Sequence, residues 1–418
     1  MTSSLYPSYT ITHVDLASQK ALPELNYQGQ GNYIVFWWKE IALGHLFIEP
    51  NCPLSEQTYH ETLLNVIKPT LERYAARHSL EKEPWANWVL QRNFKRWDTW
   101  LNSVFVDWRS TVIPQQVPVS VIICTRNRAP SLQLCLESLR RMVCQPAEII
   151  VVDNAPSDTS TLKVTKAYPN LKYVAEIAPG LSYARNTGVK KAACDIIAFT
   201  DDDVQLHPDW LYRVWETFLD EKIVAMTGLV IAAELQTEAQ QIFEKHWSFN
   251  RGYDDVHYDI HYWAKSLRTA PPVWDIGAGA NSAFRKSVFK EAGLFNEKLG
   301  AGASGCSEDS EMWFRILIQG HSIHYNPRAV VYHTHRKRLT DLERQLFYYM
   351  RGHAAAALIQ HEQQPQAGYA RHLWRMPRYY AYLLRAGFPF YRFRSRTLWS
   401  EVKGLVSGVV FYYQNRGS

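Results

Sequence analysis

The sequence predicts an α/β protein whose central part is an open sheet with helices packed against it. Short, nearly continuous apolar runs recur between residues 118 and 336, which is typical of strands buried on both faces of a parallel sheet. Segments with helical spacing of apolar residues separate these runs, and this alternation indicates βαβ units. The chain has 418 residues, 46% of them hydrophobic and 21% charged, which suits a folded protein of two or three domains.

Different patterns flank this central part. Residues 1–115 contain strand-like pieces, "YIVFWW" and "IALGHLFIE", and then a helical pattern that Pro69 is expected to interrupt. A linker with two prolines, "STVIPQQVPVS", follows. We therefore predict a small N-terminal accessory α+β domain over 1–115, a central domain over 116–336, and a helical, basic and aromatic C-terminal extension over 337–418.

Several strands of the central domain are expected to end at one edge of the sheet. The expected strands are, in chain order, residues 119–124, 147–154, 171–176 and 195–201. Right-handed crossovers bring the ends of such strands together, and with them Thr125, Asp153 and Asp201. Ligands of open α/β sheets bind at the carboxyl ends of strands, so the site is expected there.

Composition limits the partners and the location. The formal net charge of +6 is only mildly basic, so we expect no nucleic-acid partner. Six scattered cysteines without a CxxC pair suit a reducing compartment better than a disulfide framework. The N-terminus lacks a basic region followed by an apolar core, and no apolar run reaches about 18 residues. We expect a cytoplasmic protein without a transmembrane helix.

The loops after the first two strands carry groups that suit a nucleotide. Thr125 ends the first strand, and Arg126 and Asn127 begin a loop whose arginines can bind phosphate, or can simply be solvated. Asp153 ends the second strand and can accept a hydrogen bond from a base or a ribose. Taken alone it is better explained by an Asx-type turn. Arg185, in "YARNTG", is equally typical of an ordinary amphipathic helix.

Three adjacent carboxylates, Asp201, Asp202 and Asp203, follow the apolar residues 196–199. Like charges this close repel each other unless a cation offsets them. Mg²⁺ and Mn²⁺ take oxygen ligands, typically one or two carboxylates plus substrate phosphates. Asp201 and Asp203 point to the same side if the backbone is extended. The alternative is a helix cap or a solvated turn, since "HPDWL" begins a helix just after.

The order of motifs resembles a family 2 glycosyltransferase with the GT-A fold, over about residues 118–336. The motifs are "VSVIICTRNR", "IIVVDNAPSD", "GLSYARNTGV", "IIAFTDDDV", "GAGANSAFRKSVF" and "GLFNEKLGAGASGCSEDSEMWFRIL". The resemblance implies a GT-A-type, Rossmann-like mixed sheet flanked by helices. It implies an inverting enzyme that moves one sugar from a nucleotide-diphosphate sugar, with a UDP-sugar favoured, to a hydroxyl acceptor. It also implies Mn²⁺ or Mg²⁺ as the cofactor.

The resemblance assigns roles to individual residues. The base, ribose and diphosphate would be bound by Thr125, Arg126, Asn127, Asp153, Arg185 and Asp201. The metal ligands would be Asp203, Asp201 and a trailing histidine, His335 in preference to His333. Asp202 would be a helper or simply solvated.

A second acidic pair, Glu308 and Asp309, stands where a glycine-rich loop enters a helix. In the family, the second acid of this pair is the catalytic base, which implies that Asp309, with Glu308 beside it, takes the proton from the acceptor hydroxyl. The nucleoside diphosphate would leave as an anion that the metal stabilises. Without the family, a favourable interaction with the helix dipole would explain both acids.

Other readings predict different residues. "GAGASG" matches GxGxxG but lies late in the domain and not after the first strand, which excludes a dinucleotide site. A nucleotidyltransferase of similar fold would carry a glycine-rich loop with a lysine after the first strand. A non-catalytic carbohydrate-binding relative would be expected to lose Asp203 or Asp309. The chain has no QxxRW motif, so we expect one sugar to be added per encounter.

Residues 371–402 mix arginines with tryptophans, tyrosines and phenylalanines. Such a mixture favours an anionic lipid surface, because cations meet the head groups while Trp and Tyr settle at the interface. A peripheral contact with the inner face of the membrane is one expectation. Packing of the aromatic residues onto the central domain is the other, because Pro377 and Pro389 break any long amphipathic helix.

Overall fold

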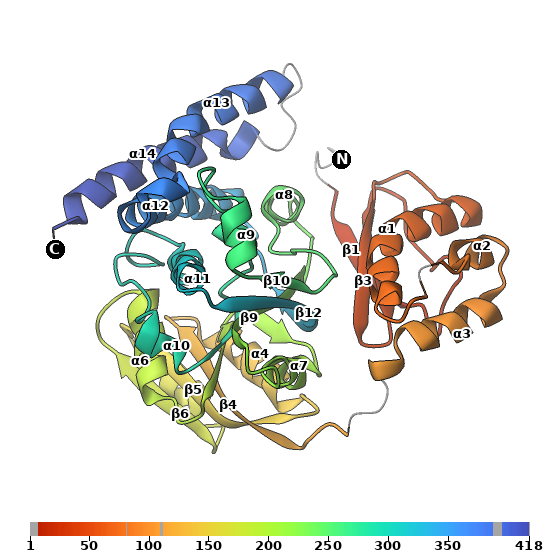
Figure 1. The fold of residues 1–418 in the computed structure, drawn as a ribbon, viewed down its shortest axis with the longest axis horizontal. Coiled ribbons are helices and arrows are strands. Elements are labelled where there is room, and N and C mark those ends of the chain that lie inside the picture. The colour runs from red at the N-terminus through yellow and green to blue at the C-terminus, as the bar shows by residue number, and fades with distance from the viewer. Residues whose placement is uncertain (1–6, 81, 109–111, 388–394, 418) are drawn as a thin grey trace.

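The computed structural model describes residues 7–80, 82–108, 112–387 and 395–417. Within these residues the strands form one three-stranded sheet and one nine-stranded sheet. The smaller sheet lies at one side of the larger one, and the last helices lie at the opposite side (Figure 1). The division into domains at residues 1–115, 116–336 and 337–418 stays a proposal.

The N-terminal sheet is buried on both faces. Its strands, in the order β1-β2-β3, are β1 (Tyr9–Asp15), β2 (Gly31–Trp38) and β3 (Ile41–Ile48). One face packs on helices α1 (Glu56–Ala76), α2 (Trp85–Leu90) and α3 (Phe94–Val104), which η1 (Val106–Trp108) follows. Helix α1 continues through Pro69 instead of breaking there, because the buried Ile67 and Leu71 anchor it on both sides.

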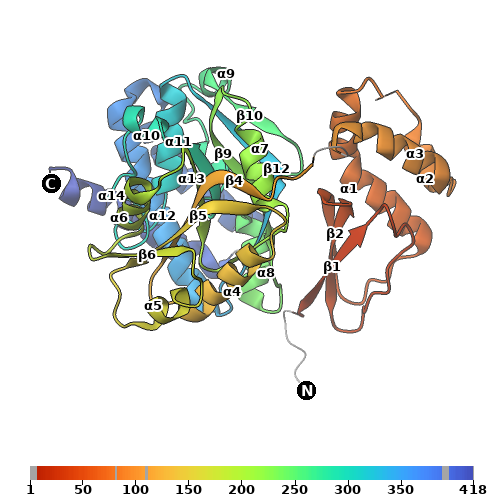
Figure 2. The same ribbon diagram turned by 90° about the horizontal axis from the view of Figure 1, so that it is seen from below.

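The other face of the N-terminal sheet contacts the central sheet. Alternate residues of β2, Tyr33, Val35 and Trp37, pack with Leu229 and Val330 of the central domain. A second view shows the two sheets beside each other, with helix α8 at the junction (Figure 2). A continuous apolar contact therefore joins the N-terminal residues to the part of the chain that carries the motifs quoted above.

The central sheet is mixed, as expected. Its strands are β4 (Gln116–Thr125), β5 (Gln145–Asn154), β6 (Leu171–Glu176), β7 (Ile196–Asp201), β8 (Val204–Leu206), β9 (Ile223–Ala232), β10 (Val256–Tyr258), β11 (Asn281–Arg285) and β12 (Ser322–His333). Their order is β10-β12-β9-β11-β7-β4-β5-β6, and β8 pairs with β12. Strands β4 to β7 are parallel, while β11 runs antiparallel to β7 and β9.

The register brings the predicted strand ends together. Thr125 lies opposite Asp153, and Cys124 lies opposite Asp201. Neighbouring residues of β4 enter different cores, with Ile122 on one face and Ile123 on the other. The nearly continuous apolar run is thus explained by burial on both faces.

Helices cover both faces of this sheet. They are α4 (Ala129–Arg140), α5 (Ser160–Thr165), α6 (Leu181–Lys191), α7 (Trp210–Thr217), α8 (Glu238–Trp247), α9 (Ile260–Lys265), η2 (Val273–Asp275), α10 (Val288–Glu291) and α11 (Glu308–Ile318). Helices α4 and α7 pack on one face, through Leu136 and Trp210. Helices α6 and α11 pack on the other, through Ala184 and Trp313.

The C-terminal part is helical, as predicted. It consists of α12 (Leu339–Gln363), η3 (Pro365–Ala367), α13 (Tyr369–Gly387) and α14 (Ser395–Asn415). Helices α12 and α14 lie so close that a Cβ atom at Gly404 would be 2.2 Å from the Phe347 carbonyl oxygen. In the described ranges no helix is long and apolar enough to cross a membrane. The part of the basic, aromatic stretch at 388–394 lies outside the described residues.

Candidate functional site

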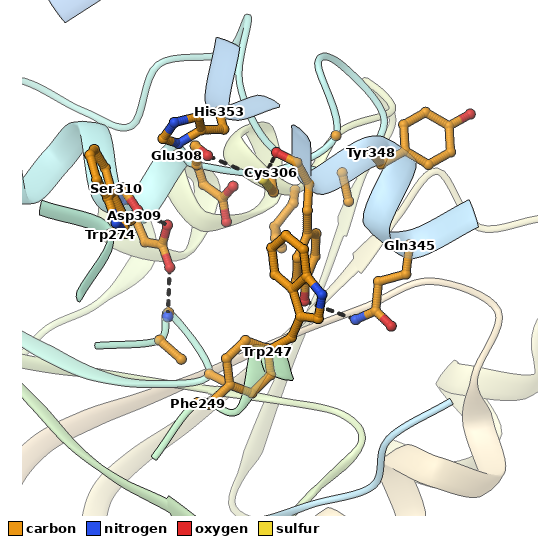
Figure 3. A pocket seen from close by; sticks show the side chains of 18 of the residues that line it. Trp247, Phe249, Trp274, Cys306, Glu308, Asp309, Ser310, Gln345, Tyr348 and His353 are labelled. Atoms are coloured by element: carbon orange, nitrogen blue, oxygen red, sulfur yellow. Dashed lines mark hydrogen bonds between the residues drawn. The ribbon is translucent and has the colours of Figure 1, made fainter. Parts of the chain in front are cut away.

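A cavity of about 1600 Å³ opens at the carboxyl ends of β4, β5 and β7 and extends to helices α12 and α13. Most of the predicted residues line it, namely Thr125, Arg126, Arg185, Asp201, Asp203, Glu308 and Asp309. Asn127, Asp153 and His335 are not among the residues that line it. Figure 3 shows part of the cavity, where Trp247 from the end of α8 and Phe249 from the segment after it project into the same space as Asp309.

The middle carboxylate of the acidic run is buried and bonded within the protein. Asp202 is 3% exposed and accepts hydrogen bonds from Thr125 Oγ1 at 2.7 Å and from Arg128 Nη1 at 2.7 Å. Burial raises the pKa of Asp202 to about 6, with Arg128 opposing this effect and Asp203 adding to it. Asp202 is therefore not solvated, and it holds the loop after β4 against the loop after β7.

Asp203 meets three basic side chains. Its Oδ2 lies 2.9 Å from Arg128 Nη1 and 3.8 Å from Arg336 Nη1, and its Oδ1 lies 3.4 Å from His333 Nε2. Burial alone would raise the pKa of Asp203, but His333, Arg128 and Arg336 outweigh it and hold that pKa well below its usual range. Asp203 is therefore ionised and faces the cavity.

Arg185 joins the strand end to the second acidic pair. Its side chain is 3% exposed, with Nη1 2.6 Å from Glu308 Oε1 and Nη2 3.7 Å from Asp201 Oδ1. Burial raises the pKa of Glu308 to about 7, while Arg185 opposes the shift and Asp309 adds to it. A Cβ atom at position 279 would lie 2.6 Å from Arg185 Nη2, so Gly279 leaves room for this guanidinium. Arg185 therefore lines the cavity with its positive charge already paired with Glu308 and Asp201.

Asp309 is the more accessible acid of its pair. Its Oδ2 accepts a hydrogen bond from the Gly279 backbone N–H at 2.8 Å, and its Oδ1 accepts one from the Ser310 N–H at 2.6 Å. In the described chain no ion pair to Asp309 is seen, whereas Glu308 is buried against Arg185. Ser307 has a φ of 72°, a left-handed conformation that turns the chain into α11 just before these acids. Two amide donors thus fix a partly exposed carboxylate in the cavity wall.

The residues expected near the nucleotide base lie at the far end of this edge. Asp153 is 1% exposed and accepts a hydrogen bond from the Tyr173 hydroxyl at 3.0 Å through Oδ2. Its Oδ1 is buried without a partner at hydrogen-bond distance in the residues the structure describes, so it can accept one more donor. Asn127 is turned toward the next loop, where its Oδ1 accepts from Ser157 N and Oγ. Arg126 is exposed at the cavity.

The two histidines after β12 have different partners. His333 Nε2 faces Asp203, as described above. His335 Nε2 lies 2.9 Å from Glu244 Oε2, and its Nδ1 lies 3.0 Å from His333 Nδ1, so both ring nitrogens of His335 already contact protein atoms. Of the two, His333 is the histidine that the structure brings to the acidic run.

The donor atoms at Asp203 suit a hard divalent cation in part. Among the described residues, no group of three or more acidic, histidine or cysteine side chains is arranged to hold a metal by itself. Asp203 and His333 offer two adjacent donors, an oxygen and a nitrogen. Mg²⁺ typically keeps few protein ligands and completes its shell with water and substrate phosphates. The pair therefore fits a cation that arrives together with a diphosphate.

Sequence reasoning did not assign the residues on the helical side of the cavity. Trp274 stacks on His372 with a centroid distance of 5.0 Å, and His353 Nε2 lies 3.0 Å from His372 Nε2. These residues come from η2, α12 and α13 and line the cavity with Arg375. No local motif connects them, and only the packing of α12 and α13 against η2 brings them together. Arg128 stands in the loop after β4, and the acidic run at the end of β7, three strands later in the chain, was the signal for its role.

Comparison with known proteins identifies similar chains. Residues 120–293 match the family model described as glycosyl transferase family 2. A pre-mycofactocin glycosyltransferase of Mycobacterium tuberculosis is 26% identical over 251 residues, which are 59% of this chain and 49% of that protein. A glucosyl-dolichyl phosphate glucuronosyltransferase of Haloferax volcanii is 23% identical over 228 residues, 51% of this chain and 68% of that one. The chain spans about half the length of the first relative.

Among solved structures, a mannosyltransferase of Pyrobaculum calidifontis in complex with GDP-Man and Mn²⁺ is similar over 83% of this chain and 99% of that chain. The identity is 18% and the TM-score is 0.46. A likeness of this size says nothing about the substrate of the present chain.

Proposed function

Because the chain belongs to glycosyl transferase family 2 through residues 120–293, we propose that it is a metal-dependent, inverting glycosyltransferase. It moves one sugar from a nucleoside-diphosphate sugar to a hydroxyl group of an acceptor. The observation that carries this proposal is that one cavity holds both the Asp203–His333 pair and the accessible carboxylate of Asp309. Groups that suit a cation and a group that can accept a proton thus line the same cavity.

The donor is bound along the edge formed by β4, β5 and β7. Asp153, near the end of β5, stays the residue assigned to the base, and Asp201, which lines the cavity, is assigned to the ribose. Arg126 and Arg336 offer positive charge to the diphosphate. The preference for UDP stays a prediction, to be decided against GDP.

We assign the metal to Asp203 and His333, and not to His335, because His333 lines the cavity with its Nε2 toward Asp203, whereas His335 is not among the lining residues. When bound, Mn²⁺ or Mg²⁺ supplies positive charge to the leaving diphosphate. Asp201 keeps a place near this pair through the Arg185 contact.

Asp309 accepts the proton of the acceptor hydroxyl as that oxygen attacks C1 of the sugar. The hydrogen bonds from Gly279 and Ser310 hold its carboxylate in one orientation, which lowers the cost of aligning it with the acceptor. One displacement of this kind inverts the anomeric centre. Glu308 acts indirectly by holding Arg185.

We further propose that α13 and the start of α14 touch an anionic membrane surface. Trp374 is 84% exposed, Tyr382 66% and Trp399 72%, so these rings do not pack onto the central domain. Exposed arginines alternate with them on α13. Rings with apolar and polar edges, set among cations, suit a lipid interface.

The test of the enzymatic proposal is product analysis with defined donors. The purified chain is incubated with UDP- and GDP-sugars, with and without Mn²⁺, and release of nucleoside diphosphate is measured. Mn²⁺-dependent release with one donor is expected, and NMR of the product reports the anomeric configuration. Pyrophosphate release from a sugar phosphate and a nucleoside triphosphate would instead identify a nucleotidyltransferase. Tight binding of a donor without turnover would identify a carbohydrate-binding relative.

A further inference from the structure

A continuous chain of polar contacts links the N-terminal sheet to Asp203. In its outer part, His45 Nδ1 lies 2.7 Å from Tyr253 Oη, Asn250 Nδ2 donates to Tyr253 Oη at 3.0 Å, and Asn250 N donates to Ser248 Oγ at 3.1 Å. Ser248 Oγ then donates to Glu244 Oε1 at 3.0 Å, and Glu244 Oε2 lies 2.9 Å from His335 Nε2. In the inner part, His335 Nδ1 lies 3.0 Å from His333 Nδ1, and His333 Nε2 lies 3.4 Å from Asp203 Oδ1. The chain starts in β3, passes through α8 and the segment after it, and ends at the acidic run.

The inner part of this chain is shielded from water. Glu244 is 6% exposed, His335 3% and His333 7%. Aromatic rings enclose the imidazoles, with Phe243 at 4.6 Å from His335 and Phe249 at 5.3 Å from His333 between ring centroids. Hydrogen bonds in such surroundings are strong and an unpaired donor is costly, so the proton positions are strongly constrained.

If His335 carries a single hydrogen, the contacts leave one arrangement of hydrogens on the two imidazoles. As a carboxylate, Glu244 can only accept, so the hydrogen of His335 lies on Nε2. With only that hydrogen on the ring, His335 Nδ1 is bare and can only accept. The contact between the two Nδ1 atoms then requires a hydrogen on His333 Nδ1. Nε2 of His333 is thereby the nitrogen directed at Asp203.

We propose that Glu244 and His335 are positioning residues that hold His333 in the form and orientation needed beside Asp203. This inference rests on the proposed function, since it presumes that Asp203 and His333 meet a metal–diphosphate. A ligating imidazole commonly donates its second N–H to a carboxylate or another acceptor, which fixes the ring and raises its basicity. Here an additional imidazole stands between the ligand and the carboxylate.

The same geometry gives the N-terminal sheet a part in the site. Its β3 residue His45 holds Tyr253, and Glu49 pairs with Lys245 of α8 at 2.9 Å. Gln241 of α8 also donates to the Pro7 carbonyl oxygen at 2.6 Å. These contacts with the N-terminal residues hold helix α8, which carries Glu244. The N-terminal residues thus support His333 without contacting substrate.

The first test compares two buried carboxylate–histidine pairs. Glu244→Gln replaces the obligatory acceptor by an amide, whereas Asp255→Asn does the same to a carboxylate 2.9 Å from His324 Nε2, outside the chain of contacts. Mn²⁺ affinity is measured by electron paramagnetic resonance in the presence of UDP or GDP. Glu244→Gln is expected to weaken it by about 10- to 100-fold, the usual effect of losing such a partner, and Asp255→Asn to leave it unchanged.

Equal effects of the two variants on Mn²⁺ affinity, or no effect of Glu244→Gln, would overturn the inference. A wild-type protein that bound no Mn²⁺ would instead refute the metal dependence on which it rests. Unfolding curves of both variants separate loss of affinity from loss of fold.

The second test needs no metal. Histidine ¹⁵N chemical shifts of the metal-free protein report which nitrogen of each imidazole carries hydrogen. His335 is expected to be neutral with its hydrogen on Nε2, and to populate the other tautomer in Glu244→Gln. A hydrogen on Nδ1 of His335 in the wild-type protein would refute the arrangement.

The contribution of the N-terminal sheet is tested by removing single hydroxyl groups. Tyr253→Phe deletes the oxygen between His45 and Asn250, whereas Tyr74→Phe deletes one bonded to Asp255 at the same junction. Tyr253→Phe is expected to weaken Mn²⁺ binding by about 2- to 10-fold, as the loss of one hydrogen bond allows, and Tyr74→Phe to leave it unchanged. Equal affinities of the two variants would limit the N-terminal sheet to a structural role.

Discussion

Arg128 Nη1 lies 2.7 Å from Asp202 Oδ1 and 2.9 Å from Asp203 Oδ2, so one guanidinium group bridges two neighbouring carboxylates. The chain itself supplies a cation that offsets their repulsion. The acidic run is thus tolerated before any ligand arrives, and Asp203 is held ionised and oriented by the same contact. The metal proposed at Asp203 would add positive charge to carboxylates that Arg128 already neutralises in part.

Arg128→Met should therefore lower stability and weaken donor binding together. Removal of one partner leaves buried carboxylates uncompensated, but Arg128 is 32% exposed, so water screens part of the loss. We expect a decrease of about 1–3 kcal/mol in the free energy of unfolding by urea. Calorimetric titration with UDP or GDP should show weaker binding. Arg338→Met, which breaks the exposed pair with Asp341, is the matched control and should change neither.

The pH dependence of stability should carry the signature of Asp202. Its pKa is about 6 in the folded protein, above the ordinary value of about 4, so the folded state holds a proton that the unfolded state has lost. The resulting stabilisation is present below about pH 4 and disappears as the pH rises through about 6. The amide of Asp202→Asn cannot ionise, so this variant should not lose that part of the free energy of unfolding as the pH rises.

Urea unfolding of both proteins at about pH 4 and about pH 8 measures the effect of Asp202→Asn. Relative to the wild-type protein, the variant should gain about 1–3 kcal/mol between the two pH values, because one pKa unit corresponds to about 1.4 kcal/mol. A difference that does not change with pH would show that Asp202 titrates normally.

Local pattern was sufficient to predict the strands and the edge at which they end. The apolar runs of β4, β5 and β7 are long enough to predict burial on both faces, and parallel pairing then brings Thr125, Asp153 and Asp201 together. Contacts between residues that only tertiary packing brings together could not be predicted from local pattern. Glu244 and His335 are far apart in the chain, and the choice between His333 and His335 depends on which of them lines the cavity.

Asp202 illustrates the same limit. A run of three acids predicts exposure, since buried charges are rare. Its burial depends on Thr125 and Arg128, which the parallel pairing of β4 with β7 brings alongside. The N-terminal sheet likewise gave no sequence signal for its partner, because alternating residues on β2 show two apolar faces but not what covers the second one.

Asp203→Ala should abolish metal-dependent donor binding while the fold is retained. The variant removes the oxygen that pairs with His333 and leaves Arg128 bonded to Asp202. Nucleotide affinity measured by calorimetry should lose its response to Mn²⁺, and the unfolding transition should stay cooperative. Binding of nucleotide and Mn²⁺ as in the wild-type protein would show that the metal is held elsewhere.

Asp309→Asn should keep donor binding and lose transfer. A general base acts in the transition state, so turnover should fall by about 10²- to 10⁴-fold while donor affinity is retained. The amide keeps the shape of the carboxylate, and rapid-quench kinetics with a saturating donor separates chemistry from binding. Glu308→Gln should behave differently, with lower stability, because Arg185 loses its 2.6 Å partner. Near-normal turnover of Asp309→Asn would move the role of base to another residue.

The exposed face of α13 and α14 should bind anionic vesicles in a salt-dependent manner. Arg371 and Arg378 lie beside Trp374 on α13, and all three are exposed. Each arginine near an anionic surface contributes about 1 kcal/mol, and salt screens this attraction. The full-length chain should therefore sediment with phosphatidylserine vesicles at low salt and be released at high salt.

Charge reversal of both arginines, or Trp374→Ser with Trp399→Ser, should abolish sedimentation. Ile177→Ser with Leu219→Ser removes equally exposed apolar side chains elsewhere and should have no effect, since those residues lie on other elements. If the full-length protein stays in the supernatant at low salt, the membrane contact is refuted, and the exposed rings of α13 must serve another partner.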